Sequence, residues 1–117
     1  MKIDSHHHFW KYDPVRYSWM NESMEVLKKD YQPDDLLLET ERKGIDGVVS
    51  VQADQSMLET DELLEHAARH DFIKGVVGWF PLVDPSVEDL LTKYAENPWL
   101  KGVRHVVQDE PDDRFIL

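Results

Sequence analysis

The segments Asp46-Gly47-Val48-Val49, Lys74-Gly75-Val76-Val77 and Lys101-Gly102-Val103-Arg104 repeat one pattern: a charged residue, a glycine, and then one or two β-branched residues. The copies recur at intervals of about 28 residues, near the length of one βα unit when roughly 250 residues form eight units. Short runs rich in β-branched and aromatic residues are typical of buried strands. The repeat therefore predicts strands over about residues 48–51, 75–80 and 103–107.

A stretch with helical character precedes each of these strands. The three stretches cover about residues 32–43, 57–70 and 84–97. Pro33 suits a first helical turn, and Gly44 suits the position just past a helix end. Ser56 and Asp84 suit helix starts as capping residues. Strands that alternate with helices predict an α/β fold of parallel βα units with right-handed crossovers.

Lys2-Ile3-Asp4-Ser5-His6-His7-His8-Phe9-Trp10 supplies a further strand at the start of the chain. The count is then about four βα units of a (β/α)8 barrel of the TIM type, so residues 1–117 are expected to form one domain, the N-terminal part of such a barrel. The chain is either a truncated enzyme or a natural half-barrel that forms a homo-oligomer through its exposed sheet edges. Residues 11–30 fit no regular element, and we expect a loop that forms the catalytic face, covers the barrel end, or does both.

Composition narrows the functional classes. The net charge of -11 over 117 residues argues against nucleic acid and anionic membrane surfaces as partners. The chain has no cysteine, which excludes disulfides and thiolate metal sites. It has no apolar run long enough for a signal peptide or a membrane span. We therefore expect a soluble cytoplasmic protein that acts on small molecules.

The first strand carries the residues with the most distinctive chemistry. Side chains alternate between faces along a strand, so Asp4, His6, His8 and Trp10 share one face and His7 points to the other. Buried imidazoles need partners, and a divalent cation would serve His6 and His8 together. Asp4 would then orient a ligand from behind. The alternatives are the remnant of an affinity tag and a hydrogen-bonded pair of core histidines.

The fourth strand carries a second candidate group. Arg104, His105 and Gln108 lie where barrel enzymes place active groups, at the carboxyl end of a strand. The arginine would bind a carboxylate or a carbonyl oxygen, and the histidine would act as a base or bind a substrate hydroxyl. The alternative is that Arg104 pairs with Asp109 or Glu110 on a solvated rim.

Weaker candidates follow the second and third strands. Gln52 would hydrogen-bond a polyol or a lactone, and Trp79 would stack on a sugar, as would Trp10 from the first strand. Gln52 and Trp79 are equally compatible with barrel packing. An acidic run in the second helix is expected to be solvated: Glu59, Asp61, Glu62 and Glu65.

Four blocks of the sequence together resemble the amidohydrolase-2 group, in particular its L-fuconolactonase and L-rhamnonolactonase branch. The blocks are residues 3–10, 47–52, 75–79 and 102–111. The resemblance implies a (β/α)8 hydrolase that opens a sugar-acid lactone, with His6 and His8 as ligands of a divalent metal, expected to be zinc. It also implies that Arg104, His105 and Gln108 belong to the substrate pocket. His7 departs mildly from the family pattern, and the family's remaining ligands come from later strands.

Two other functions remain compatible with these residues. A decarboxylase or hydratase can use the same scaffold, and the residues that distinguish it lie in later strands. The chain can also be an inactive half-barrel that functions by association. In either case we expect the 117 residues alone to be catalytically silent, because two histidines make an incomplete metal site.

Overall fold

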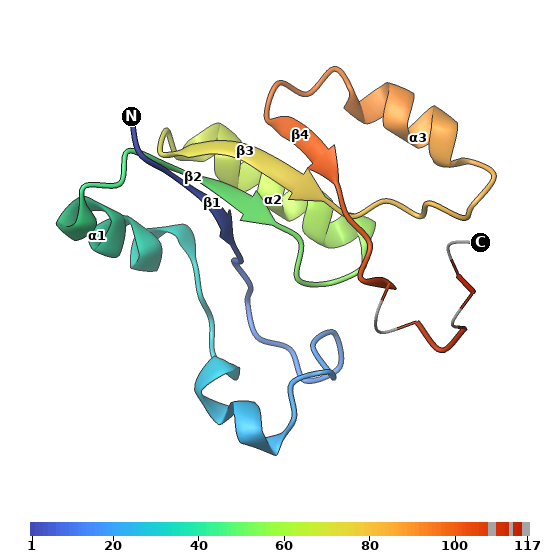
Figure 1. Cartoon of the computed structure of the whole chain (residues 1–117), viewed down its shortest axis with the longest axis horizontal. Coiled ribbons are helices and arrows are strands. Elements are labelled where there is room, and N and C mark those ends of the chain that lie inside the picture. Colours follow the sequence, from blue (N-terminus) through green and yellow to red (C-terminus); the bar gives the residue numbers. More distant parts are fainter. Residues whose placement is uncertain (108–109, 113, 116–117) are drawn as a thin grey trace.

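The computed structural model describes residues 1–107, 110–112 and 114–115, which form one sheet with helices between its strands (Figure 1). The strands are β1 (Ile3–His7), β2 (Gly47–Val51), β3 (Ile73–Gly78) and β4 (Leu100–Val103). The helices are the 3-10 helix η1 (Glu22–Leu27) and the α-helices α1 (Pro33–Lys43), α2 (Met57–Arg69) and α3 (Val87–Tyr94). All three strand pairs are parallel, in the order β1-β2-β3-β4. The predicted α/β fold of parallel units is confirmed.

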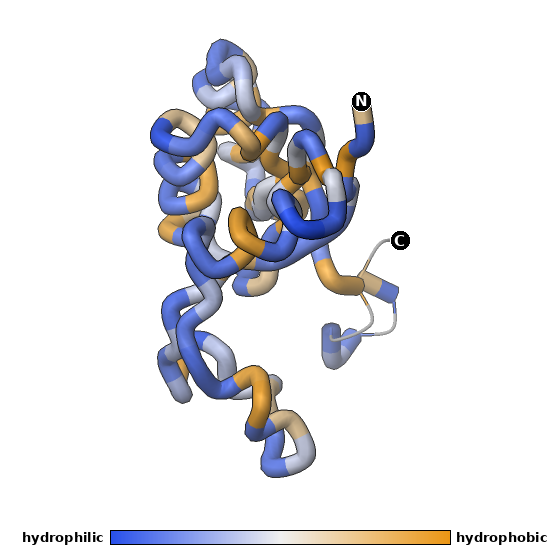
Figure 2. Tube along the Cα trace, turned by 90° about the vertical axis from the view of Figure 1, so that its left-hand side faces the viewer, coloured by the Kyte–Doolittle hydropathy of each residue, from blue (hydrophilic) through white to orange (hydrophobic). Residues whose placement is uncertain are grey.

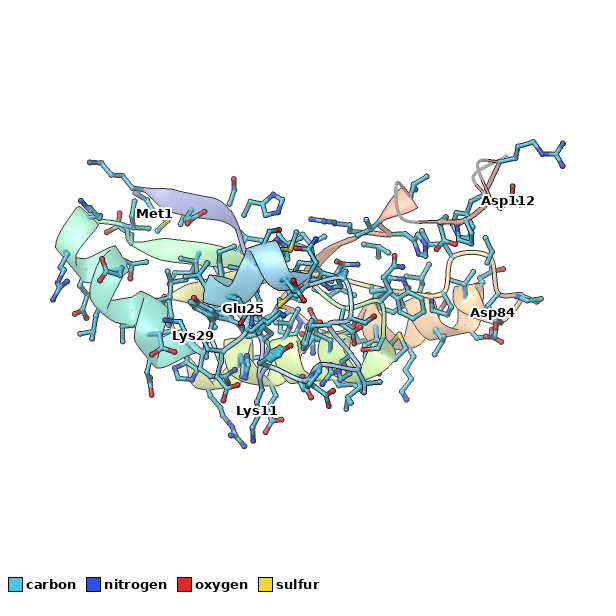
Figure 3. The ribbon with its side chains drawn as sticks, turned by 90° about the horizontal axis from the view of Figure 1, so that it is seen from below. Met1, Lys11, Glu25, Lys29, Asp84 and Asp112 are labelled. Atoms are coloured by element: carbon cyan, nitrogen blue, oxygen red, sulfur yellow. The ribbon has the colours of Figure 1, made fainter. Side chains whose placement is uncertain are left out.

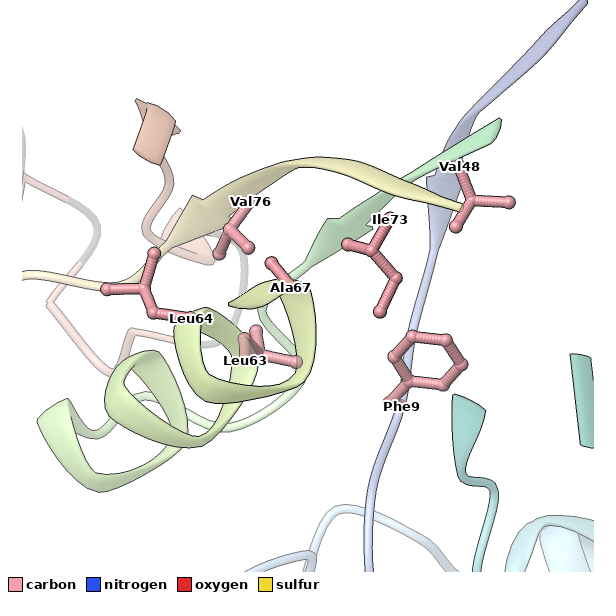
Figure 4. Packing of buried hydrophobic residues seen from close by; sticks show 7 residues of the cluster. All are labelled: Phe9, Val48, Leu63, Leu64, Ala67, Ile73 and Val76. Atoms are coloured by element: carbon pink, nitrogen blue, oxygen red, sulfur yellow. The ribbon is translucent and has the colours of Figure 1, made fainter. Parts of the chain in front are cut away.

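The α-helices lie on one face of the sheet, as the view from below shows (Figure 3). The main core fills the space between α2 and this face (Figure 4), and its buried members are Phe9, Val48, Leu63, Leu64, Ala67, Ile73 and Val76. Burial of this apolar surface is the main stabilising contribution to the fold. The opposite face, toward which a barrel would close, carries no helix within the described residues.

The glycines of the internal repeat make room for the neighbouring strand. A Cβ atom on Gly47 would stand 2.5 Å from Cγ of Lys74, and one on Gly75 would stand 2.6 Å from Cγ of Lys101. Each glycine therefore accommodates the lysine that precedes the glycine of the next copy. This packing gives a physical reason why a charged residue and a glycine recur together along the chain.

Two strands end earlier than their sequence patterns predict. The third strand covers Ile73–Gly78 instead of residues 75–80, because the Trp79 N–H donates to Oγ1 of Thr60 (3.0 Å) instead of continuing the ladder. The fourth covers Leu100–Val103 instead of residues 103–107, because the Val106 N–H donates to Oε1 of Gln55 (2.8 Å). Side-chain acceptors from outside the sheet thus end both ladders.

The helix boundaries follow the predicted capping residues at two of three sites. Pro33 opens α1, and Gly44 ends it in the left-handed region at a φ of 67°. The Ser56 hydroxyl caps α2 by accepting from the Glu59 N–H (3.2 Å). The third helix begins at Val87 instead of Asp84, because Asp84 Oδ1 accepts from the Ser86 N–H (2.8 Å) in a preceding turn. No helix within the described residues has the length and apolar character needed to cross a membrane.

The segment after β1 projects away from the sheet and carries hydrophobic stretches (Figure 2). The prediction of no regular element here was wrong for η1, which follows an Asn21 cap. The segment returns to its start through a bridge between Trp10 and Tyr31, with backbone N–H to O distances of 2.9 and 2.8 Å. Trp10, Tyr17 and Met20 form a second buried cluster beneath it. The segment is therefore a packed part of the fold.

Candidate functional site

An open pocket of about 560 Å³ lies at the carboxyl ends of β1, β2 and β4, next to the segment that follows β1. Its polar and aromatic lining includes His8, Trp10, Arg16, Gln52, Asp54 and Arg104. Parallel strands end at one edge of a sheet, so side chains from distant parts of the sequence converge there. The pocket thus has the position at which α/β proteins bind small molecules.

His8 is oriented by the neighbouring strand. Its Nδ1 atom lies 2.8 Å from the carbonyl oxygen of Val51, so Nδ1 carries the proton and Nε2 keeps a lone pair. Burial lowers the pKa of His8, which favours the neutral ring. The ring of His6 stands nearly perpendicular to it at an interplanar angle of 82°, with 5.0 Å between centroids. His8 therefore has the neutral ring and the available Nε2 lone pair that metal coordination by imidazole requires.

Arg104 reaches this pair from the fourth strand. Its Nη1 atom lies 3.3 Å from Nε2 of His6. A guanidinium can only donate, so His6 accepts through Nε2. None of the described carboxylates forms an ion pair with Arg104. The guanidinium therefore brings a positive charge to the edge of the pocket.

His7 lies on the opposite, helix-covered face, as alternation along the strand predicts. Its Nε2 lies 3.1 Å from Oγ of Ser50, and its ring stacks edge-on against Phe9. Burial lowers the pKa of His7 to about 4. Asp4 accepts a hydrogen bond from the backbone N–H of His6 (3.1 Å), whereas the expected role was to orient an imidazole.

Gln52 occupies the floor of the pocket. Its side chain is fully buried, and neither its amide oxygen nor its amide nitrogen has a hydrogen-bond partner among the described residues. An unpaired buried polar group costs about 1–3 kcal/mol, so such an amide is suited to a ligand. Beside it Trp10 donates Nε1–H to the carbonyl oxygens of Leu27 and Lys29 (3.2 and 2.8 Å).

Glu59 connects the segment after β1 to the start of α2. It is 1% exposed and accepts from the backbone N–H groups of Ala53 and Asp54 at 2.6 Å each, while the Tyr17 hydroxyl lies 3.4 Å away. Burial raises the pKa of Glu59 to about 7. The expectation of a solvated acidic run was therefore wrong at this position, because the first turn of α2 faces the loops around the pocket.

The second predicted group is divided in the structure: Arg104 lines the pocket, whereas His105 belongs to a separate cluster with Trp79 and Glu110. Nε1 of Trp79 donates to Nδ1 of His105 (2.9 Å), and Nε2 of His105 lies 2.5 Å from Oε1 of Glu110. Neither His105 nor Trp79 lines the pocket. Both ring nitrogens of His105 are engaged, so it can act as a base only after one of these bonds opens. Gln108 lies outside the described residues.

A sequence profile of the amidohydrolase family matches residues 3–115, which is nearly the whole chain. The chain belongs to the amidohydrolase family. The match includes His6, His8 and Arg104.

Two relatives of this amidohydrolase chain are L-fucono-1,5-lactonases. The protein from Burkholderia multivorans is 38% identical over 117 residues, which are 100% of this chain and 39% of the relative. The protein from Burkholderia ambifaria is 31% identical over 115 residues, which are 98% of this chain and 40% of the relative. The chain thus spans about two-fifths of the length of these relatives.

The same fold is found in a crystal structure of an amidohydrolase from Burkholderia multivorans with bound zinc. The two share a TM-score of 0.92 and 37% identity, over 99% of this chain and 40% of the other. A second crystal form with bound HEPES matches equally well. The expected four βα units of a (β/α)8 barrel are in agreement with this likeness.

The candidate metal ligands of this amidohydrolase chain, His6 and His8, fall short of a complete site. Within the described residues no group of three or more His, Cys, Asp or Glu side chains is placed to hold a metal ion. Catalytic zinc sites use three protein ligands. His6 and His8 have the right chemistry for two of them, and any further ligand must come from outside the described residues.

Arg16, Asp54 and Gln55 line the pocket, although none of them was predicted from the sequence. Arg16 belongs to a loop without periodicity, and it reaches the pocket only because the segment folds back at Tyr31. Asp54 and Gln55 follow the second strand directly. Their position after a strand was the one signal that could have marked them.

Proposed function

We propose that this chain provides the amino-terminal part of the active site of a hydrolase that opens a sugar-acid lactone, such as an L-fucono- or L-rhamnonolactone. The observation that supports it most directly is a pocket lined by His8, Arg104 and a Gln52 amide without a partner among the described residues, with His6 packed against His8. The names of the two curated relatives point to the same reaction class.

In this proposal His6 and His8 hold a divalent metal, which we expect to be zinc. Such an ion polarises a lactone carbonyl and lowers the pKa of a bound water. The Val51 carbonyl keeps His8 in the tautomer that presents Nε2. The proposal applies to a closed barrel, in which further strands complete the ligand set.

The other pocket residues bind and orient the lactone. Arg104 donates to the acyl oxygens, which carry negative charge as the ring opens. Gln52 bonds to a ring hydroxyl, and the indole face of Trp10 packs against the apolar face of the sugar. We keep Gln108 and Trp79 as expected contacts of the same ligand, and His105 as the candidate base.

The test uses the complete protein product of the gene, supplied with Zn²⁺ and assayed for acid release from L-fucono-1,5-lactone and L-rhamnonolactone. We expect hydrolysis that falls at least about a hundredfold in His6→Ala and His8→Ala, since a metal contributes several kcal/mol. His70→Ala, which removes an imidazole at the end of α2, is the matched control and should retain activity. A product that hydrolyses neither lactone at any metal concentration contradicts the proposal.

Residues 1–117 form one domain in this proposal, with β1 and β4 as edge strands. Ile3 and Val103 leave 39% and 37% of their surface exposed there. Open edges of a parallel sheet favour association, so we expect the 117-residue chain to form homo-oligomers. A compact monomer in gel filtration with light scattering would argue against this expectation.

A further inference from the structure

Arg16 enters the pocket from the segment after β1 with one nitrogen unpaired. Its Nε lies 3.2 Å from Oδ2 of Asp54, and its Nη1 lies 3.4 Å from Oε1 of Glu62. The remaining nitrogen, Nη2, is buried and has no partner among the described residues. The ion pairs fix the guanidinium plane, so Nη2 is an oriented donor on a side chain that lines the pocket.

The surroundings of Arg16 set the kind of acceptor that Nη2 suits. The two carboxylates, Asp54 and Glu62, more than balance its single positive charge, so this group does not attract an anion. A neutral oxygen such as a hydroxyl can still accept from Nη2 without meeting like charge. Gln52, also unpaired and lining the same pocket, can donate to one hydroxyl and accept from another.

Arg104, which lines the same pocket, differs from Arg16 in its surroundings. Its Nη1 atom lies 3.3 Å from Nε2 of His6, and none of the described carboxylates pairs with it. An arginine that no carboxylate pairs keeps its attraction for the carboxylate of a ligand or for an acyl oxygen that gains charge. The two arginines of the pocket therefore differ in charge balance. The positive charge of Arg104 has no described carboxylate beside it, whereas that of Arg16 is balanced by two carboxylates.

We propose that Arg16 is a specificity-determining residue that donates a hydrogen bond to a hydroxyl of a polyhydroxylated acid or its lactone. The acyl carbon of the ligand lies toward Arg104 and the histidines, and the hydroxyl-bearing carbons lie toward Arg16 and Gln52. This inference rests on the proposed function, because it assigns the direction in which the lactone binds.

The experiment compares two acids bound by the full chain, with heats of binding measured by calorimetry. L-Fuconate, the acid formed when L-fucono-1,5-lactone opens, carries hydroxyls, and acetate shares only its carboxylate. We expect Arg16→Met to weaken L-fuconate binding by about tenfold and to leave acetate binding unchanged. Arg42→Met removes an exposed, ion-paired arginine on α1 and serves as the matched control.

Arg16→Lys separates recognition from a merely structural role. A lysine can keep an ion pair with Asp54 but cannot present a second, fixed donor. We expect this variant to melt like the wild type and to bind L-fuconate as weakly as Arg16→Met. Recovery of wild-type affinity in Arg16→Lys would make Arg16 a structural residue and would overturn the inference.

Failure of the inference is distinct from failure of the proposed function. Equal L-fuconate affinities in wild type and Arg16→Met, or no L-fuconate binding by the wild type, would overturn the role of Arg16 whatever the activity. If the complete gene product hydrolyses no lactone while L-fuconate binding still depends on Arg16, the recognition role stands and the lactonase proposal falls.

Discussion

Nη1 of Arg104 lies 3.3 Å from Nε2 of His6, although the two residues are 98 positions apart in the sequence. The hydrogen bond occupies a lone pair that a metal ion would need. It also places a positive charge next to the expected cation site. We therefore expect Arg104 to compete with the proposed metal at His6, and to become available for substrate when a metal takes its place.

Removal of this charge should tighten zinc binding. We expect Arg104→Met to bind Zn²⁺ about tenfold more tightly than wild type, because the substitution removes both the repulsion and the competing donor. Calorimetric titration of the full chain with zinc measures the difference. Arg42→Met, which changes an exposed arginine paired with Glu39, should match wild type. Equal or weaker zinc binding by Arg104→Met would contradict the competition.

Glu59 should make stability depend on pH. Burial raises the pKa of Glu59 from 4.5 to about 7, although the Ala53 and Asp54 N–H groups favour its charged form. The folded protein therefore holds this proton more tightly than the unfolded chain does. The resulting stability is fully present below about pH 4.5 and is lost as the pH rises through about 7.

The measurement is urea unfolding of wild type and Glu59→Gln at pH 4.5, 6 and 7.5. The free energy of unfolding of wild type minus that of the variant should fall by up to about 3 kcal/mol across this range. Glu65→Gln alters a carboxylate of the same helix that is 57% exposed, and its difference from wild type should stay flat. A difference that rises with pH for Glu59→Gln would show that hydrogen bonding to the carboxylate outweighs burial.

Gly78 should be essential for packing β3 against α2. A Cβ atom there would stand 2.8 Å from Cγ2 of Thr60, whose hydroxyl donates to the Trp79 carbonyl at 2.8 Å and accepts from its N–H at 3.0 Å. Thr60 cannot move without losing both bonds, so Gly78→Ala should cost about 1–3 kcal/mol of unfolding free energy.

Gly102→Ala is the matched control, because its Cβ would meet Val77 at an ordinary 3.6 Å. Urea unfolding of both variants gives the comparison. The packing argument fails if Gly102→Ala loses as much stability as Gly78→Ala.

Substitution of His105 tests whether this residue and its partner Trp79 take part in catalysis. If it is the base, His105→Gln should lower kcat of the complete gene product by about a hundredfold or more. Trp79→Phe removes the indole donor but keeps the imidazole, so it should lower the melting temperature with a much smaller effect on kcat. Similar, small kcat losses in both variants would assign the pair to the structure alone.

The sequence by itself predicted the parallel βα units, the separation of His7 from His6 and His8, and the caps at Pro33, Gly44 and Ser56. These features depend on local regularities: a spacing between strands, the alternation of side chains along one strand, and residue types with strong backbone preferences. The structure confirms them because no distant contact opposes them.

Only the tertiary structure decided where the ladders end and which residues meet. Thr60 and Gln55 end strands β3 and β4 because side chains from other elements take the backbone donors. Arg16 reaches the pocket because its loop folds back, while His105 turns toward Trp79 and Glu110. Such pairings join residues far apart in the sequence, and no local pattern encodes the distance between them.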